Sequence, residues 1–577
     1  KLLIYNRLWV FLQALLKKLK QLRTNVEEPF EHFDWQLDFP EILNPYLKNK
    51  ETRGFDIVIA NPPYVGVKSN AEIFKMIKKS KFSRFFKGRA ELFYFFMHLS
   101  NDLTVNKGLS TFITTNYFIT SSDGNILRKE LKDNTTLLRL LNFNELKLFS
   151  TALGQHNMIS MFQKGNFKNK IVKTFYTSLK GIATKQTFNR LFSEKDINTE
   201  YFNLEQGEVF EGDEYYIRTR GVSGGNKILS NIFLAFKKGT KLGLICNIKQ
   251  GLRTGIDKIS NSHINKFDFK GIKGEGVFIL SLQEIKKLGF NKPNEIIKPL
   301  FKNSDIEKFY SKKNTDQFIL YIDNDINLKT LKIQYPSIYK HIFRFKNLIC
   351  KIRGVNKENV ENWFRLDRPR EKYLFEGEKI CVPQRSNDNR FGYHIGDWFS
   401  SADVYIIKSR YKKYKLKFLL ALLNSNLFYL WFYYKGKRKG EMLELYQKPL
   451  SDAPIVLAKN ENIYIKLIDY ILLIKQFESI YNNLSLIDSY YELIINGMVY
   501  ELYFPELFKK HKRQIMPHLG ELPELRTEMS DEEKLTICKA VYYRLHEEDH
   551  PLRQNLENLD EIPEIALVEK EVGKKLK

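Results

Sequence analysis

The sequence predicts an α/β protein in which a partial Rossmann-like sheet is followed by an α+β domain and a helical C-terminal region. Three observations support this fold class. Short β-branched runs alternate with segments of helical spacing in residues 55–165, a pattern typical of a sheet with covering helices. Residues 241–460 mix short strands and turns with few helices. Residues 461–577 have mostly helical spacing.

The α/β part contains seven expected elements, and the pattern starts in the middle of such a fold. Strands are expected at 55–60, 110–118, 137–145 and 158–164, the last two as a closing pair, and helices at 71–79, 91–103 and 124–134. Upstream, residues 1–22 predict an amphipathic helix rather than a signal peptide. Asn6 and Arg7 interrupt its apolar run, and no small-residue cleavage site follows.

At 577 residues the chain is long enough for about three to five domains with cores of their own. The expected boundaries are an α/β domain at 1–165, a polar, glycine-containing connector at 166–240, an α+β module at 241–460 and a helical region at 461–577. The α+β module contains a long apolar helix at 417–432.

The charge is strongly positive and unevenly distributed. The chain has 93 Lys and Arg against 67 Asp and Glu, a net charge of +26, whereas residues 501–577 have 13 basic against 17 acidic side chains. Residues 401–440 carry ten basic side chains and one acid, interleaved with aromatic residues. This combination favours a nucleic acid as partner. The alternative is a compositional bias towards lysine, in which the charges only solvate the surface.

The four cysteines are far apart and none forms a Cys-x-x-Cys pair. A disulfide framework and a zinc ribbon are therefore not expected, and scattered thiols indicate a reducing, cytoplasmic location. No apolar run reaches the roughly 18–20 residues of a membrane-spanning helix, so no membrane partner is expected. The oligomeric state is left open.

One motif carries chemistry: Asn61-Pro62-Pro63-Tyr64 directly follows the apolar strand 55–60. In an open α/β sheet, ligands bind beyond the carboxyl ends of the strands. These residue types suit methylation of an exocyclic amine. The Asn61 side-chain oxygen and the Pro62 carbonyl can accept its two hydrogens, which localises the lone pair on nitrogen as the transition state forms.

The other residues of the motif complete this hypothesis. Pro62 and Pro63 fix the backbone and remove competing donors. Tyr64 offers a face on which an extruded base can stack, and base flipping is implied because the amine is unreachable inside a stacked duplex. No metal is needed. The structural alternative is an Asn-Pro-Pro turn that merely ends a strand.

The motif in this context resembles the catalytic motif of amino-group DNA methyltransferases, in its adenine-specific form. The preceding HFDWQLDFPEIL is similar to the large adenine methylases of type IIG restriction-modification enzymes and of phage-exclusion systems. The resemblance implies S-adenosylmethionine as methyl donor. It implies that Leu92 and Phe93, in GRAELFYFF, line the cofactor adenine, and that Phe149 contacts the flipped base. Ordinary core packing is the alternative for all three.

Four later segments, at 246–260, 294–310, 383–407 and 417–428, are similar to a TaqI-like target-recognition domain, which implies double-stranded DNA as partner. Arginine or lysine can contact guanine, and asparagine or glutamine adenine, in the major groove. The candidate DNA contacts are Arg253, Lys258, Gln384, Arg385 and Arg390. Each can instead be a phosphate-binding or surface residue.

The sequence departs from the family in one respect. The glycine-rich loop that binds the cofactor, and the acidic residue that holds its ribose, belong upstream of the motif and are not found in these 577 residues. We therefore expect a fragment that cannot methylate by itself, whose upstream part could include a nuclease domain. The glycine-containing segments at 273–276 and 222–225 lie in the wrong context and are not expected to bind cofactor.

The sequence His546-Glu-Glu-Asp-His550 spells a zinc-protease motif, but its charged interior and the following Pro551 favour a structural interpretation without metal. The combined interpretation is a site-specific adenine DNA methyltransferase of a restriction-modification system. Two alternatives are a non-catalytic DNA-recognition protein with a degenerate methylase fold and a methyltransferase that acts on RNA or protein.

Overall fold

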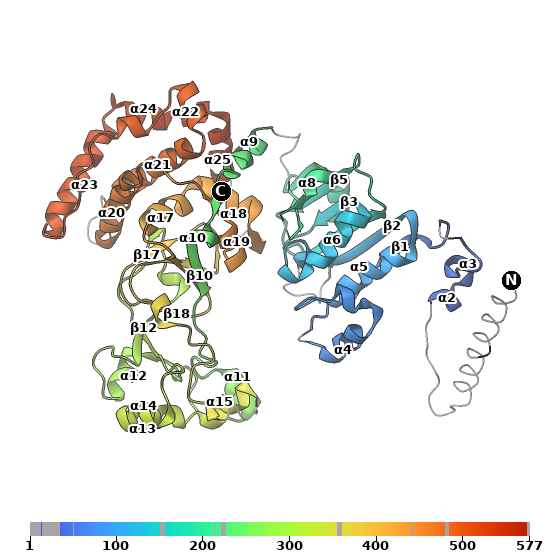
Figure 1. Ribbon diagram of the computed structural model, residues 1–577, viewed down its shortest axis with the longest axis horizontal. Helices are drawn as coiled ribbons and strands as arrows, with labels where there is room; N and C mark the ends of the chain where they lie inside the picture. The colour runs from blue at the N-terminus through green and yellow to red at the C-terminus, as the bar shows by residue number, and fades with distance from the viewer. Residues whose placement is uncertain are drawn as a thin grey trace. The chain divides into compact units, whose positions relative to one another are not determined.

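The computed structural model describes Gln13 and residues 35–49, 51–67, 69–149, 156–212, 214–220, 227–354, 361–439, 442–478 and 484–573. The chain divides into two compact units, unit 1 at Lys1–Gly225 and unit 2 at Asn226–Lys577, which are shown in Figure 1. Apart from Gln13, the helix expected at residues 1–22 lies outside the described residues, as do Gly224 and Gly225.

Unit 1 contains a six-stranded mixed sheet in the order β1-β2-β4-β3-β5-β6. β1 pairs with β2 in parallel, β4 lies antiparallel between β2 and β3, and β5 pairs with β3 in parallel and with β6 antiparallel. The strands are β1 (Phe55–Ala60), β2 (Thr104–Thr115), β3 (Thr135–Asn142), β4 (Asn157–Lys164), β5 (Ile171–Thr177) and β6 (Thr199–Glu205). The expected α/β class and the closing pair of strands are confirmed.

The helices of unit 1 are α2 (Trp35–Asp38), α3 (Pro40–Leu43), α4 (Ala71–Lys79), α5 (Leu92–Leu103), α6 (Asn125–Asn134), α7 (Lys185–Phe192) and α8 (Gln206–Val209). Figure 1 shows α5 and α6 side by side against the sheet. The core between them and the sheet is aromatic and aliphatic, with Phe93, Phe112, Phe118, Leu127, Leu140 and Phe162 almost fully buried.

The structure corrects the prediction that residues 166–240 form a polar connector. β5, α7 and β6 of this segment extend the sheet of unit 1 and contribute Val172 and Leu204 to its core. In both strands exposed polar residues such as Lys173 and Glu200 stand between the buried ones, so the apolar strand pattern in the sequence is weak.

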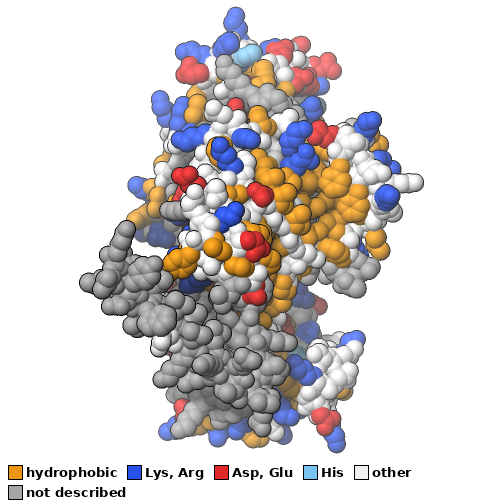
Figure 2. Space-filling view, turned by 90° about the vertical axis from the view of Figure 1, so that its right-hand side faces the viewer, with side chains coloured by type: hydrophobic (Ala, Val, Ile, Leu, Met, Phe, Trp, Pro, Cys, Tyr) orange, Lys and Arg blue, Asp and Glu red, His pale blue; other side chains and the backbone are white. Residues whose placement is uncertain are grey.

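β1 lies at one edge of the sheet in the described residues and exposes Ile57 and Ile59, at 59% and 78%. Figure 2 looks onto the side of Figure 1 where β1 lies, and hydrophobic side chains gather on it. The start of β1 is held by aromatic contacts, because the Phe55 ring lies 6.2 Å from Trp35 and 5.3 Å from Phe39. These two rings belong to the HFDWQLDFPEIL segment, which thus anchors the strand that precedes the motif.

Unit 2 contains a five-stranded sheet, β10-β19-β15-β17-β13, and a four-stranded sheet, β11-β14-β12-β18. The strands of the first are β10 (Cys246–Gln250), β13 (Phe309–Tyr310), β15 (Lys379–Pro383), β17 (Gly392–His394) and β19 (Val404–Ser409). Those of the second are β11 (Ile279–Ser281), β12 (Ile297–Phe301), β14 (Gln317–Leu320) and β18 (Phe399–Ser400). One core, which includes Trp398, Phe301, Tyr321 and Phe399, connects both sheets.

The remaining elements of unit 2 are mostly helices. Short ones are α11 (Asn261–Phe267), α12 (Leu282–Lys287), α13 (Leu328–Gln334), α14 (Pro336–Phe343), α15 (Lys346–Arg353) and α19 (Gln447–Asp452). The C-terminal region, expected to be helical, consists of α20 (Glu461–Phe477), α21 (Leu484–Tyr503), α22 (Pro505–His511), α23 (Asp531–His546), α24 (Pro551–Glu557) and α25 (Pro563–Gly573). The small strand β21 (Met442–Glu444) pairs with β16 (Arg385–Ser386) on one side and with β20 (Lys437–Lys439) on the other.

The prediction of a single helix at 417–432 is also corrected. The structure has two helices there, α17 (Leu416–Asn424) and α18 (Asn426–Lys435). Ser425 lies at the break, and its side chain accepts the first-turn N–H of Phe428 as an N-cap. In the described part of the chain no single helix has the length and apolar character to cross a membrane, although α17 and α18 together, bent by 70°, pass by length and composition. Most side chains of both helices are buried within unit 2.

Candidate active site and nucleic-acid groove

The Asn-Pro-Pro-Tyr motif lies at the edge of the sheet where three neighbouring strands come together. Asn61 follows β1, and β2 runs parallel to β1, so both carboxyl ends meet at this edge. β4 runs antiparallel to β2, and its first residue, Asn157, pairs with Thr115 at the end of β2. This is the edge at which open α/β sheets bind ligands.

Glycine is required where the chain enters β1. Gly54 has φ +137°, and a Cβ atom there would lie 2.5 Å from the backbone nitrogen of Val105. A side chain would therefore push the beginning of β1 away from β2 and displace the strand that ends in Asn61.

Tyr64 is the centre of the hydrogen bonds at this site. Its hydroxyl lies 3.1 Å from Asn61 Oδ1 and 3.1 Å from the Ile113 carbonyl oxygen, and it can donate to either. Asn157 Nδ2 donates to the same hydroxyl over a long 3.5 Å. Burial raises the pKa of Tyr64, an effect that the Asn157 hydrogen bond partly offsets. The hydroxyl is therefore neutral and a donor at physiological pH.

The four residues differ in accessibility. Asn61 and Pro63 are exposed, Tyr64 is half-buried and Pro62 is buried. Asn157 is completely buried at 0% exposure, and its Oδ1 has no hydrogen-bond partner among the described atoms. The site thus presents an accessible carboxamide, backed by a buried one, with no charged side chain in its hydrogen-bond network.

The segment that resembles a cofactor-binding element lies directly beside the motif. The Leu92 N–H donates to the Val65 carbonyl over 2.8 Å, and Gly66 forms a bridge with Glu91. Leu92 is half-buried, whereas Phe93 is fully buried and packs edge-on against Tyr94 at 4.8 Å. The structure therefore brings Leu92 to the motif and places Phe93 in the core.

Phe149 follows β3 and is half-buried at the end of a described stretch. Residues 150–155, which follow it in the sequence, lie outside the described residues. The role of Phe149 against a flipped base therefore stays a prediction.

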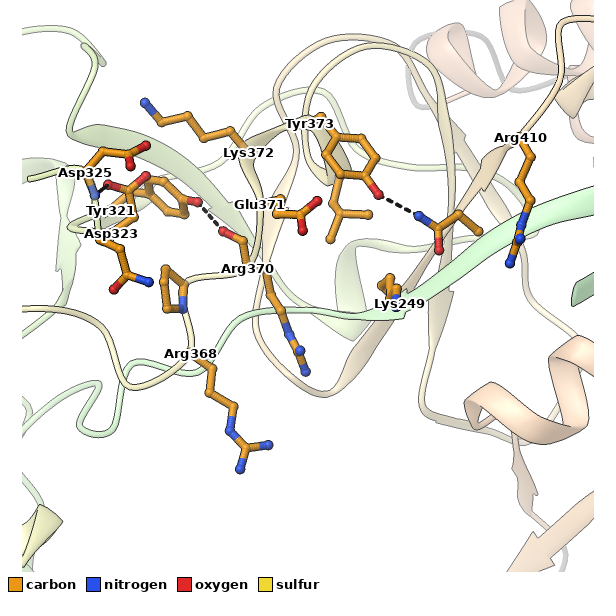
Figure 3. A pocket seen from close by; sticks show the side chains of 14 residues that line it. Lys249, Tyr321, Asp323, Asp325, Arg368, Arg370, Glu371, Lys372, Tyr373 and Arg410 are labelled. Carbon is orange, nitrogen blue, oxygen red and sulfur yellow. Dashed lines mark hydrogen bonds between the residues drawn. The ribbon is translucent and has the colours of Figure 1, made fainter.

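Unit 2 contains a groove of about 850 Å³, here called the basic groove, between β10, the chain after β14, the 368–374 segment and the end of β19. Five cations and three carboxylates line it: Lys249, Arg368, Arg370, Lys372, Arg410, Asp323, Asp325 and Glu371. In Figure 3 the guanidinium groups of Arg368, Arg370 and Arg410 extend to the same side.

The cations of the basic groove are held to different degrees. Arg370 donates to the Gly251 carbonyl over 3.4 Å, and Arg410 to the Cys246 carbonyl over 3.1 Å. The exposed side chains of Lys249 and Arg368 make no hydrogen bond or ion pair with any described residue. Two fixed and two unpaired cations on one groove form a suitable surface for a polyanion.

The five predicted DNA contacts fall into two groups. Arg253 and Lys258 line a second pocket, of about 370 Å³, and the backbone of Arg253 pairs with that of Arg368. The Lys258 ammonium donates to Gln317 over 3.0 Å, and Arg253 lies 3.6 Å from Asp367. Arg253 is thus the predicted residue that the structure places directly beside the basic groove.

The other three predicted contacts lie on or near β16. Arg385 is bound to Glu444 at 3.1 Å and to the Tyr446 hydroxyl at 2.9 Å, while Arg390 is bound to Ser386 and Asp388. Gln384 donates its backbone N–H to Asp403. These arginines are already neutralised by carboxylates within the protein.

Sequence reasoning missed Lys249 and Arg368. The run Arg368-Pro-Arg-Glu-Lys372, with three cations in five residues, was an available signal. Lys249 is the single charged residue of β10, and its sequence context gave no such signal.

The zinc-protease-like sequence does not form one helical turn. His546 ends α23 and stacks on Tyr542 at 5.0 Å, whereas His550 accepts the Leu552 N–H as the N-cap of α24. No group of three or more potential metal ligands occurs in the described ranges.

Two family models match the chain. Residues 5–149 match the Eco57I restriction-modification methylase, a range that includes the Asn-Pro-Pro-Tyr motif, and residues 298–455 match the TaqI-like C-terminal specificity domain. The second range falls within the α+β module expected at 241–460.

The similar proteins are methyltransferases and a restriction-modification enzyme. The type II methyltransferase M.HindII of Haemophilus influenzae is 24% identical over 445 residues, which are 72% of this chain and 78% of M.HindII. M.BstVI of Geobacillus stearothermophilus is 24% identical over 71% of this chain and 67% of its own length. The solved structure of the type IIL restriction-modification enzyme MmeI in complex with DNA has a TM-score of 0.52 at 12% identity.

That structure covers 89% of this chain, and the chain covers 59% of MmeI. The fold resembles that of a restriction-modification enzyme, and the relatives are type II methyltransferases of restriction-modification systems. More particularly, the chain combines an Eco57I-type methylase region with a TaqI-like specificity domain, and the expected resemblance is confirmed.

Proposed function

We propose that the protein is a site-specific DNA methyltransferase that transfers a methyl group to the exocyclic amine of an adenine rotated out of the duplex. The observation that carries this proposal is the exposed Asn61 carboxamide at the carboxyl end of β1, next to Tyr64 and the beginning of α5. The family matches and the type II methyltransferase relatives support it.

The residues of the motif act on the amine. Asn61 Oδ1 accepts one hydrogen and the Pro62 carbonyl the other, which draws the nitrogen towards a tetrahedral geometry with its lone pair available. Because both acceptors are neutral and fixed by the strand end and two prolines, they need little rearrangement in the transition state. Tyr64 holds the base by stacking.

S-adenosylmethionine, the donor that the family implies, would supply an electrophilic methyl group. Leu92, beside the motif and half-buried, fits an apolar contact with its adenine ring, whereas the fully buried Phe93 has no free surface for it. The residues described here thus supply the amine side of the reaction and one part of a cofactor site.

We infer that duplex DNA is held by the basic groove and by Arg253 beside it. Lys249 and Arg368 can approach phosphates without breaking an internal ion pair, in contrast to Arg385 and Arg390. Arginine side chains in such a groove can also read guanine, and Asp325 could accept from a cytosine amine. MmeI, which has the same fold, was solved in complex with DNA.

The test is the methylation pattern that the full-length protein produces. Expressed in a bacterial strain without adenine methylation of its own, it should methylate adenines at one recurrent sequence, detected by single-molecule sequencing. Asn61→Ala should remove this pattern. Methylated cytosines, methylated RNA or protein, or no methylation at all would contradict the proposal, and the last result with intact DNA binding would favour a non-catalytic recognition protein.

A further inference from the structure

The Tyr64 hydroxyl occupies the very acceptor that the proposed reaction needs. Asn61 Oδ1, which would accept a hydrogen of the target amine, lies 3.1 Å from this hydroxyl. The Ile113 carbonyl lies at the same distance. A phenol has a single proton, so the two oxygens share it or receive it alternately. The Asn61 carboxamide is therefore contacted by a side chain of the site itself.

Tyr64 is held in this position from three adjacent strands. Asn61 follows β1, Ile113 lies in β2 and Asn157 begins β4. Asn157 is fully buried, directs Nδ2 towards the Tyr64 oxygen and leaves Oδ1 without a partner among the described atoms. The described side-chain hydrogen bond of this buried carboxamide goes to Tyr64, so its position is coupled to that of the hydroxyl.

We propose that Tyr64 is a placeholder for the target amine, and that Asn157 is the positioning residue that keeps it in place. In the structure the hydroxyl can donate to Asn61 Oδ1, in alternation with the Ile113 carbonyl. An incoming adenine exchanges one donor for another at Oδ1, and the displaced tyrosine ring becomes available for stacking. This inference rests on the proposed function, because it assigns the amine of that reaction as the displacing group.

The exchange has a measurable consequence. Binding of the base includes the loss of the Tyr64 hydrogen bonds, so removing only the hydroxyl should strengthen binding, while removing the ring should weaken it. A net hydrogen bond corresponds to about a threefold to tenfold change in an equilibrium constant. Tyr64→Phe should therefore lower the Kd for target DNA by about this factor, and Tyr64→Ala should raise it.

The experiment measures fluorescence anisotropy of labelled duplexes with the full-length protein and without cofactor. One duplex carries the sequence that the protein methylates, and the other carries a scrambled version. Tyr64→Phe should tighten binding of the first only, and KM for DNA should fall more than kcat. Tyr201→Phe, on β6 at the opposite edge of the sheet, is the matched control and should change neither duplex.

Asn157 is tested by a double-mutant cycle. Asn157→Leu should tighten target binding in the same direction, and it should add nothing in the Tyr64→Phe background, because both variants act through one hydroxyl. An additive effect would show that Asn157 acts separately from Tyr64. Since Asn157 is buried and its variant could unfold, Tyr64→Phe decides the placeholder by itself.

The outcomes separate this inference from the proposed function. If Tyr64→Phe binds target DNA as the wild type does, or more weakly, while Asn61→Ala abolishes methylation, the placeholder is wrong and the function stands. If the wild type methylates no adenine, the function is wrong and the placeholder falls with it.

Discussion

The strand-end site of unit 1 and the basic groove of unit 2 solve different physical problems. Around Asn61 the hydrogen-bond network is neutral and short-range, with two carboxamides, one phenol and one backbone carbonyl. The basic groove is lined by five cations from segments far apart in the chain, and two of them lack an internal partner in the described structure.

This difference separates orientation from attraction. Neutral hydrogen bonds depend on geometry and respond little to salt, whereas cations that face a polyanion act over roughly 10 Å and are weakened by salt. Changes at the strand-end site should therefore lower the rate of methyl transfer and leave the affinity for DNA nearly unchanged. Alterations of the basic groove should have the opposite effect.

The largest expected effect is that of Asn61→Ala on the chemical step. Loss of one fixed acceptor of the developing charge should lower kcat by about 100-fold to 1,000-fold. The Kd for DNA, measured at the same salt concentration, should change less than about threefold, because the carboxamide carries no charge. A kcat near that of the wild type would contradict the role of Asn61, and a large loss of affinity would break the separation of the two regions.

A smaller effect concerns a basic side chain that is buried in each unit. In unit 2, Lys379 is fully buried and donates to the Gly377 and Gly396 carbonyls. In unit 1, His98 stacks on Phe85 at 3.7 Å, and neither of its ring nitrogens has a partner in the described structure. Burial, with a smaller contribution from Arg84, lowers the pKa of His98 to about 3.

The lowered pKa makes unit 1 sensitive to acid. The stability that neutral His98 contributes is complete above its unfolded pKa of 6.5 and is lost progressively as the pH falls from 6.5 towards 3. At pH 5 the loss is about 2 kcal/mol, and His98→Phe should remove it. Hydrogen exchange of the α5 amides at pH 7.5 and pH 5 measures the opening free energy, and an equal decrease in both proteins would contradict the assignment.

The smallest effect is expected for Arg368→Ala in the basic groove. If this cation neutralises one phosphate, the slope of log K against log salt should become shallower by about 1, while methylation of bound DNA continues. Arg385→Ala is the matched control, since Arg385 is already paired with Glu444. Titrations at several salt concentrations measure both, and equal slopes for the two variants would refute the distinction between unpaired and paired arginines.

The sequence was most informative where local signals agree. β1, the motif after it and the helices α4 to α6 were predictable, because a β-branched run, a proline pair and helical spacing each have a local cause. The strands β5 and β6 were missed because exposed polar residues such as Lys173 and Glu200 interrupt their apolar ones, and the break at Ser425 because a serine cap interrupts a uniformly apolar run.

The site shows the same limit at the level of single residues. Asn61 and Tyr64 could be proposed from the sequence, since they lie in one four-residue motif and are chemically distinctive. Asn157 could not be predicted, because it is 93 residues from Tyr64 in the sequence and reaches the Tyr64 hydroxyl only in the folded sheet. The ion pair of Arg385 with Glu444 likewise depends on a tertiary contact that the sequence does not show, and Arg385 as a DNA contact stays a prediction.

The most direct measurement is a structure of the full-length protein on a duplex that contains its methylated sequence. The account predicts an everted adenine whose N6 lies about 3 Å from Asn61 Oδ1 and from the Pro62 carbonyl, with the Tyr64 hydroxyl displaced from Asn61. An adenine that stays stacked in a bound duplex, or an everted base whose amine faces other acceptors, would contradict it.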